Sequence, residues 1–425
     1  MIKLLNKLFV KKNIINNETD IIHSKHFCIL PWIHTHLLPS GDVLPCCVSD
    51  FNDPYANVNK TTLQKAWNSS KYKIMRKLML LDRPVYSCNK CYELEESGIE
   101  TMRKRMNQSF KHHAPILSKT KQDGSYDQLK MKYLDIRFSN ICNFKCRGCS
   151  PALSTKWYED HQKLWNFTSS HPKLINVVAS NPNLWMEIEE QLDELEVAYF
   201  AGGEPLIMDE HYQCLEYFIK NNKTDIALQY NTNLSVLQFK KYNLVEMWKH
   251  FKKVNLSISL DDIQARGEYF RSGFNWETFL LNIEKIKNEL PHISLQINCT
   301  ISIFNIHRIP EIHSFLYGKK YINEFGFIFN TLQDPSEYRS QVLTPKLKTL
   351  TKLKLESYAK SLNESYPNTD WGFFKNSLNH QIQFMMQTNM DFRLNDFKKQ
   401  TNRLDEIRSE NFKNTYPELV SLLQS

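Results

Sequence analysis

Three cysteines stand close together in "SNICNFKCRGCSP", residues 139–151. Cys142, Cys146 and Cys149 have the spacing C-x3-C-x2-C. A zinc site normally takes four protein ligands, or three and a water. Three thiolates in one short loop can instead hold three irons of a [4Fe–4S] cluster and leave the fourth iron open. Such an open iron could bind a small molecule.

A second group of cysteines precedes this loop: Cys28, Cys46, Cys47, Cys88 and Cys91. The chain shows no secretory signal, so we expect a cytoplasmic protein, in which disulfides are rare. The C-x2-C spacing of the last two then favours a metal site over a disulfide framework. The two isolated cysteines, Cys214 and Cys299, are predicted to be small core residues.

A third feature is the pair of adjacent glycines in "AGGEPL". Gly202 and Gly203 would let the backbone approach a ligand closely. Glu204 offers a carboxylate for a cationic group. Taken alone, the same residues also fit an ordinary tight turn.

The composition is that of a globular protein, with 41% hydrophobic and 24% charged residues among 425. No apolar run approaches the length of a membrane span, so no transmembrane segment is expected. The net charge of +8 is spread along the chain. We therefore expect no nucleic-acid partner. The basic opening segment "MIKLLNKLFVKKNII" predicts a short helix.

Strand-like and helix-like segments alternate through the middle of the chain. The expected strands are 133–139, 197–202, 226–233, 254–261, 293–300 and 324–330. Helical patterns between them include 210–222 and 276–290. This rhythm predicts an α/β fold, a partial (β/α)6 TIM-like barrel of parallel strands with crossover helices. The cysteine triplet and the glycine pair then follow the first and second strands.

The flanking regions are expected to differ from this barrel. Residues 1–125 are irregular, with "LPSGDVLPCC" as a turn between two short strands and one amphipathic helix over 61–80. A polar linker follows at 117–130, and 164–185 forms an insertion after the first strand. From about 340 the chain is predicted to be helical. The expected domains are 1–125, a small Cys-rich domain; 126–335, the partial barrel; and 336–425, a helical C-terminal extension.

C-x3-C-x2-C after the first strand and "GGEP" after the second resemble the radical S-adenosylmethionine (SAM) superfamily, over roughly residues 130–330. The resemblance implies that Cys142, Cys146 and Cys149 ligate a [4Fe–4S] cluster whose open iron binds SAM. It also implies that Gly202, Gly203 and Glu204 hold the SAM amino group.

The same resemblance assigns four further SAM contacts, which are Asn233, Ser259, Asp261 and Arg271. The arginine would pair with the SAM carboxylate. One position departs from the family pattern, which often has an aromatic residue just before the third cysteine. This chain has Gly148 there, after Arg147, and Phe144 is a candidate to replace the aromatic ring.

The first cysteine group resembles a twitch domain, the reduced form of the SPASM domain, on the N-terminal side of the barrel. The implied ligands of an auxiliary [4Fe–4S] cluster are Cys28, Cys46, Cys88 and Cys91, since Cys47 would point to the opposite face of a strand. A structural zinc ribbon with the same cysteines stays open. His34 and His36 are expected to be exposed.

These features together predict a radical SAM enzyme. Reductive cleavage of SAM would give a 5′-deoxyadenosyl radical that abstracts hydrogen from a peptide, a protein, or a small sugar-like or alcohol-like substrate. The electron donor would be a flavodoxin or a ferredoxin. The alternative is a non-catalytic zinc-binding interaction module on a degenerate barrel.

Overall fold

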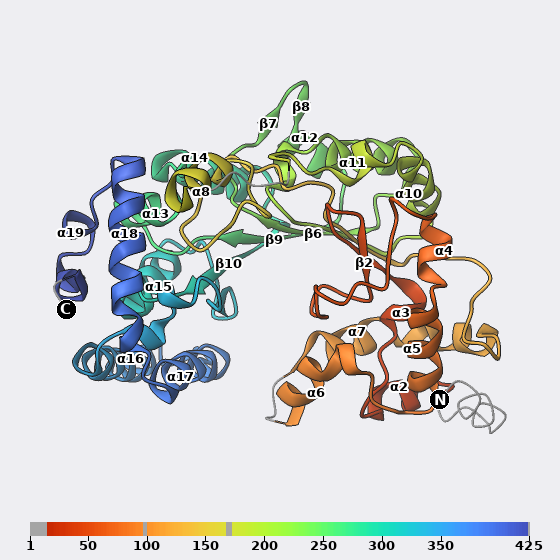
Figure 1. Ribbon diagram of the computed structural model, residues 1–425, viewed down its shortest axis with the longest axis horizontal. Coiled ribbons are helices and arrows are strands. Elements are labelled where there is room, and N and C mark those ends of the chain that lie inside the picture. Colours follow the sequence, from red (N-terminus) through yellow and green to blue (C-terminus); the bar gives the residue numbers. More distant parts are fainter. Residues whose placement is uncertain (1–14, 97–99, 167–171, 424–425) are drawn as a thin grey trace. The chain divides into compact units, whose positions relative to one another are not determined.

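The structure is a computed structural model that describes residues 15–96, 100–166 and 172–423 (Figure 1). The helix expected at the start of the chain lies outside the described residues. The chain folds into two compact units, each built from segments that are separate in sequence. The first unit comprises the described residues up to 139, together with 175–201 and 209–228. The second comprises 140–174, 202–208 and the residues from 229 onward.

The first unit contains five strands in the order β5-β4-β1-β2-β3. The parallel pairs join β4 (Tyr133–Ile136) to β5 (Val197–Phe200) and to β1 (His36–Leu37). Antiparallel pairing then adds β2 (Asp42–Leu44) and β3 (Ala56–Asn57), so the expected turn between two short strands is confirmed. The helices of this unit are α2 (Glu18–His23), α3 (Leu30–Ile33), α4 (Leu63–Trp67), α5 (Ser70–Leu80), η1 (Tyr86–Cys88), α6 (Asn89–Glu96), α7 (Met102–Phe110), η2 (Lys111–Lys119), α9 (Val177–Ser180), α10 (Leu184–Leu192) and α11 (Asp209–Lys220).

The second unit contains three parallel strands with β10 (Ser294–Ile301) between β9 (Lys253–Ser259) and β11 (Phe327–Thr331). The strand β6 (Ala227–Thr232) leads from the first unit into the second, and β7 (Gln238–Phe239) pairs with β8 (Tyr242–Asn243) as a hairpin. The helices are α8 (Trp157–Trp165), η3 (Pro205–Ile207), α12 (Leu244–Trp248), α13 (Gln264–Phe270), α14 (Trp276–Glu289), η4 (Ile306–Arg308), α15 (Ile309–Gly318), η5 (Ser336–Tyr338), η6 (Ser340–Val342), α16 (Pro345–Ser365), α17 (Gly372–Gln387), η7 (Asp391–Arg393), α18 (Leu394–Arg408), α19 (Phe412–Thr415) and η8 (Pro417–Leu423).

All six strands expected for the α/β fold are present, as β4, β5, β6, β9, β10 and β11. The two helical patterns named from the sequence correspond to α11 and α14. The helix α14 begins where the Asn275 side chain accepts a hydrogen bond from the backbone N–H of Thr278, which satisfies one of the free donors of its first turn. The predicted α/β class, with parallel strands and crossover helices, is confirmed.

The single helix expected over 61–80 is wrong, because α4 and α5 are separate helices divided at Asn68 and Ser69. The Asn68 side chain exchanges hydrogen bonds with the backbone of Tyr126, at 2.7 and 3.0 Å. It also accepts one from Arg76 at 3.2 Å. Asparagine side chains often bond to backbone groups in competition with the helix. The break between α4 and α5 is therefore caused by contacts with a segment that is distant in sequence.

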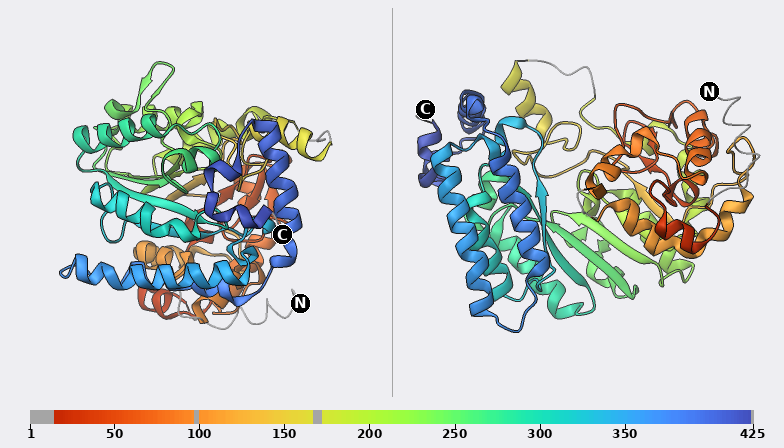
Figure 2. Two further views of the ribbon diagram at one scale, coloured as in Figure 1. Left: turned by 90° about the vertical axis from the view of Figure 1, so that its left-hand side faces the viewer. Right: turned by 90° about the horizontal axis from the view of Figure 1, so that it is seen from below.

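The C-terminal region is helical, as predicted, and Figure 2 shows α16 and α17 side by side. The helix α17 buries Phe374, Leu378, Ile382 and Met385 along one face. Cys214 on α11 and Cys299 on β10 are both fully buried core residues, also as expected. None of the helices in the described ranges is both long and apolar enough to cross a membrane.

Candidate functional site

The loop with the three cysteines is fastened by its backbone. The N–H groups of Lys145 and Arg147 donate to the carbonyls of Ser272 and Phe270, at 2.9 and 2.7 Å. The N–H of Cys149 donates to the carbonyl of Cys146 at 3.0 Å, which closes a turn. These bonds hold Cys142, Cys146 and Cys149 in one loop without using their thiols.

The three thiols are held in their neutral form by their surroundings. Burial is the main cause that raises the pKa of Cys142 and of Cys149 to about 12, and the neighbouring cysteines add to the effect. The pKa of Cys146 is also raised by burial, although the charge of Arg271 opposes the shift. Thiolates become favourable here only when a cation compensates them, as a metal does. A set of soft sulfur donors at this spacing fits an iron–sulfur cluster.

The glycine pair brings its loop against the cysteine loop. Gly202 and Gly203 have φ values of +86° and +49°. A Cβ atom on Gly203 would lie 2.1 Å from the carbonyl oxygen of Ile141, a position that only glycine can occupy. The N–H of Glu204 donates to that same carbonyl at 2.8 Å. The "GGEP" loop and the cysteine loop therefore form one continuous site in the second unit.

The Glu204 carboxylate is buried and already accepts three hydrogen bonds. The donors are the N–H of Leu206 at 3.1 Å, the hydroxyl of Thr232 at 2.6 Å and the N–H of Asn233 at 2.6 Å. A carboxylate has about four acceptor positions, which leaves room for one more donor. Burial raises the pKa of Glu204 to about 7 despite these bonds. A bound ammonium group would favour the ionised form.

Two of the remaining predicted SAM residues form a buried ion pair beside the cysteines. Arg271 contacts Asp261 at 2.8 Å and approaches the Cys146 sulfur to 3.7 Å. Asp261 also accepts the N–H of Thr300 at 2.8 Å. The Nε atom of Arg271 is buried and has no partner among the described residues. An unused donor next to the Cys146 thiol fits a bound group that carries negative charge.

The other two predicted contacts are Asn233 and Ser259. Asn233 donates from its side-chain amide to Asn143 of the cysteine loop at 2.9 Å. Ser259 ends β9 and is paired in register with Asn298 of β10. The structure therefore brings Asn233 to the cysteine loop directly, whereas Ser259 is placed at the carboxyl end of its strand, where the fold expects functional side chains.

The position that departs from the family pattern is tightly packed. A Cβ atom on Gly148 would lie 3.0 Å from the Leu332 side chain and 3.4 Å from the Phe270 ring. An aromatic side chain cannot fit there without movement of those residues. Phe144 is buried and packs edge-on against Phe274, with ring centroids 6.0 Å apart.

Arg147 connects the cysteine loop to the C-terminal helices, a link that sequence reasoning missed. Its guanidinium is fully buried and lies 3.8 Å from the centroid of the Tyr269 ring. One of its nitrogens contacts both Asp405 and Glu410 at 2.5 Å. The unusual arginine in the motif was the one available signal, but its partners are more than 250 residues away.

A second arginine, Arg408 at the end of α18, reaches the same loop by another route. It contacts Asp160 of α8 at 2.7 Å and lies over the Trp157 ring at 4.9 Å. The Trp157 indole N–H in turn donates to the carbonyl of Cys146 at 2.6 Å. The C-terminal extension is thus part of the support of the cysteine loop.

Four of the five N-terminal cysteines line one pocket in the first unit. These are Cys28, Cys46, Cys88 and Cys91, together with the apolar side chains of Leu30, Val48 and Met102. Burial, followed by the charges of Cys88 and Cys46, raises the pKa of Cys28. Cys47 instead contacts the sulfur of Met102 at 3.6 Å. The four thiols that share a pocket are a suitable donor set for a metal cluster.

The expectation that His34 and His36 are exposed is wrong, since both are buried. His34 bonds the carbonyl of Tyr133 at 2.9 Å, and His36 lies 3.1 Å from the carboxylate of Asp135. His36 is buried because its strand, β1, lies between β2 and β4. His34 follows α3 directly, and its ring lies 4.9 Å from the Tyr133 ring.

Comparisons with known proteins agree with these observations. A family model described as "SPASM: Iron-sulfur cluster-binding domain" matches residues 28–92, a stretch that contains all five N-terminal cysteines. The cysteine loop and the "GGEP" loop form a single site in the other unit. Residues 28–92 belong to the family of iron–sulfur cluster-binding SPASM domains.

Similar proteins include GTP 3′,8-cyclase of Aliarcobacter butzleri, which is 29% identical over 141 residues. The match covers 32% of this chain and 36% of that enzyme, so the chain spans only about a third of the relative. A solved structure titled "Native anSMEcpe with bound AdoMet and Cp18Cys peptide" is 18% identical, with a TM-score of 0.37, and the match covers 55% of this chain and 59% of that one. Streptococcus suis SuiB bound to S-adenosylmethionine is 13% identical, with a TM-score of 0.35 and coverage of 69% and 62%.

Proposed function

We propose that this chain is a radical SAM enzyme in which Cys142, Cys146 and Cys149 hold the open [4Fe–4S] cluster. The observation that carries the proposal is the contact of Gly203 with the carbonyl of Ile141, because it joins the two motifs into one site. When bound, the cluster and SAM supply a 5′-deoxyadenosyl radical that abstracts hydrogen from a substrate.

The residues around the cysteines have separate binding tasks in this proposal. Gly202 and Gly203 admit the SAM amino group, and Glu204 accepts a hydrogen bond from it with its remaining acceptor position. Arg271 directs its unused Nε donor to the SAM carboxylate, while Asp261 fixes the guanidinium. Asn233 and Ser259 line the site toward the ribose. The buried surroundings of these groups exclude water.

We further propose that Cys28, Cys46, Cys88 and Cys91 hold an auxiliary [4Fe–4S] cluster, whereas Cys47 does not. The pocket that the first four cysteines share, and that Cys47 does not line, supports this division. A zinc ion in the same pocket is the competing possibility. We also propose that 1–125, 126–335 and 336–425 act as an auxiliary-cluster region, a radical SAM region and a supporting extension.

The substrate class rests on the resemblance to enzymes with an auxiliary cluster. We propose a peptide, a protein, or a small sugar-like or alcohol-like molecule. A cluster held by Cys28, Cys46, Cys88 and Cys91 would supply an acceptor for the electron that the substrate loses. A flavodoxin or a ferredoxin would supply the first electron. Ligand thiols must stay reduced, so we propose a cytoplasmic location.

The test is an anaerobic assay of the protein reconstituted with iron and sulfide. Dithionite and SAM are added, and 5′-deoxyadenosine is measured by mass spectrometry. We expect product from the native chain and from Cys214→Ala, which removes a buried thiol far from the motif in sequence, and none from Cys146→Ala. If the native protein does not take up iron and keeps bound zinc, the proposal is overturned. The non-catalytic zinc-binding interaction module then becomes the better description.

A further inference from the structure

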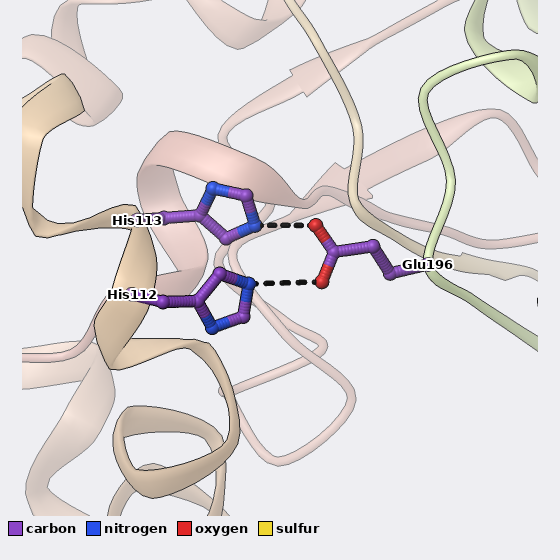
Figure 3. A group of neighbouring side chains, drawn as sticks. All are labelled: His112, His113 and Glu196. Atoms are coloured by element: carbon purple, nitrogen blue, oxygen red, sulfur yellow. Dashed lines mark hydrogen bonds and ion pairs between the residues drawn. The ribbon is translucent and has the colours of Figure 1, made fainter.

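Two histidines and a glutamate come together in the first unit, apart from the cysteines. His112 and His113 lie in the first turn of the helix η2, and Glu196 directly precedes β5 (Figure 3). The Nε2 atoms of the two imidazoles point to different oxygens of the carboxylate, at 3.1 Å from His112 and 2.6 Å from His113. The ligand atoms of the three side chains all lie within 4.8 Å of one another.

The cluster is held by the elements on either side of it. The Phe110 ring, which is buried at the end of α7, lies 6.3 Å from each of the two imidazole rings. The imidazoles are 4.2 Å apart. Glu196 is fixed by its backbone, since its N–H donates to Lys132 at 2.9 Å and its carbonyl accepts from Ala227 at 2.9 Å. The three side chains therefore start from anchored positions.

The charges nearby also suit a cation. Lys132 would repel a cation, but its ammonium group is paired with Glu194 at 2.6 Å. Glu194 is also paired with Lys130, at 3.1 Å. The carboxylate of Glu196 remains available to the two histidines.

We propose that His112, His113 and Glu196 form a site for a divalent transition-metal ion, zinc in the first instance, that is separate from both cysteine clusters. Two imidazoles and one carboxylate are a known zinc donor set, with a fourth position left for water or an external ligand. Tetrahedral ligands at zinc lie roughly 3.4 Å apart. The distance from His112 to Glu196 is close to this value, and the His113 contact needs to open by less than about 1 Å. His112 is 52% exposed at its side chain, which provides the entry path.

Zinc binding at this site is independent of the radical chemistry and can be measured directly. Protein with its cysteines loaded by iron and sulfide is titrated with Zn²⁺ in a calorimeter. We expect one zinc per chain, with affinity reduced at least about ten-fold in Glu196→Gln and in His113→Gln. His23→Gln is the matched control, because His23 is an exposed histidine of the same unit at the end of α2.

X-ray absorption at the zinc edge of the native complex gives a readout that requires no variant. We expect nitrogen and oxygen neighbours at about 2.0–2.1 Å and no sulfur at about 2.3 Å. A sulfur shell would mean that the zinc is bound by cysteine. That result, or equal affinity in Glu196→Gln and the native chain, would overturn the proposal and leave the three residues as a surface ion pair.

Discussion

Two glycines of the second unit differ in what surrounds them, and the difference can be tested. Gly203 faces the Ile141 carbonyl at a distance that excludes a Cβ atom, whereas an added Cβ on Gly318 would meet nothing within 4 Å. We expect Gly203→Ala to lower the free energy of unfolding by about 3 kcal/mol, from backbone strain and displacement of Ile141. It should also reduce the iron bound by the three-cysteine loop. Urea denaturation and iron analysis measure the two effects.

The matched control is Gly318→Ala, at the end of α15. Its unfolding free energy should stay within about 0.5 kcal/mol of the native value, as for most surface changes. If both variants behave alike, the close contact between the two loops does not constrain the site.

His34 predicts a dependence of stability on pH. Burial lowers its pKa to about 4 from an ordinary value of 6.5, so the unfolded chain takes up a proton that the folded chain refuses. The contribution of a neutral His34 is therefore complete above pH 6.5 and is lost as the pH falls toward 4. The full effect is roughly 3 kcal/mol.

The measurement is the urea midpoint between pH 7.5 and pH 5.5. The native midpoint should fall on acidification more steeply than that of His34→Gln, which cannot take up this proton. Parallel curves for the two proteins would mean that His34 is not buried in its neutral form.

The cysteine spacing and the glycine pair were sufficient to predict which residues gather at the site, since both motifs are short and local. The burial of His34 and His36 was not predictable in this way. His36 lies on a two-residue strand, which carries no clear pattern of its own and is buried by the strands beside it. His34 follows the short helix α3 and bonds the carbonyl of Tyr133, which is far away in sequence. The sequence also does not predict the ion pair of Arg271 with Asp261, because the family resemblance assigns each of the two residues to SAM.

The helix α18 and the residues just after it support the cysteine loop. Arg147 is buried between Asp405 and Glu410, so a change of both carboxylates to amides leaves a buried charge without compensation. We expect Asp405→Asn with Glu410→Gln to lower the free energy of unfolding by about 3–5 kcal/mol. The same variant should load less iron at Cys142, Cys146 and Cys149, measured as iron per chain and by the electron paramagnetic resonance signal of the reduced cluster.

Glu406→Gln is the control on the same helix. Its side chain is 67% exposed and pairs with Arg403 at 2.8 Å, the kind of surface contact that contributes little. Iron content and stability should match the native chain. If the double variant loads its full iron content, the C-terminal helices do not support the cysteine loop.

Elements of regular pattern were predictable, and those shaped by distant contacts were not. The six strands, α11, α14 and the apolar face of α17 follow from local periodicity. The break between α4 and α5 depends on a hydrogen bond between Asn68 and Tyr126, and the periodicity of the local sequence does not predict such a contact. For the same reason, the sequence pattern offered no hint that α18 supports the cysteine loop.

The two proposed clusters predict a stoichiometry for the whole molecule. If the seven proposed cysteines are the ligands, the reconstituted chain should hold about eight irons, in two [4Fe–4S] clusters. Cys46→Ser should reduce this to about four, because Cys46 lines the pocket with Cys28, Cys88 and Cys91. Cys47→Ser should retain all eight. If Cys47→Ser instead loses four irons and Cys46→Ser retains all eight, Cys47 is the ligand and Cys46 is not.

The pairing of Arg147 with Asp405 also bears on how the protein is made. The two residues are 258 positions apart. At typical rates of synthesis the ribosome needs roughly 10–50 s to travel that distance. During this interval the cysteine loop is already outside the ribosome, while the carboxylates that will bury its arginine do not yet exist. We therefore expect the cysteine loop to take up iron and sulfur only after the C-terminal helices are made, and a nascent chain stalled before α18 should load iron within residues 28–92 first.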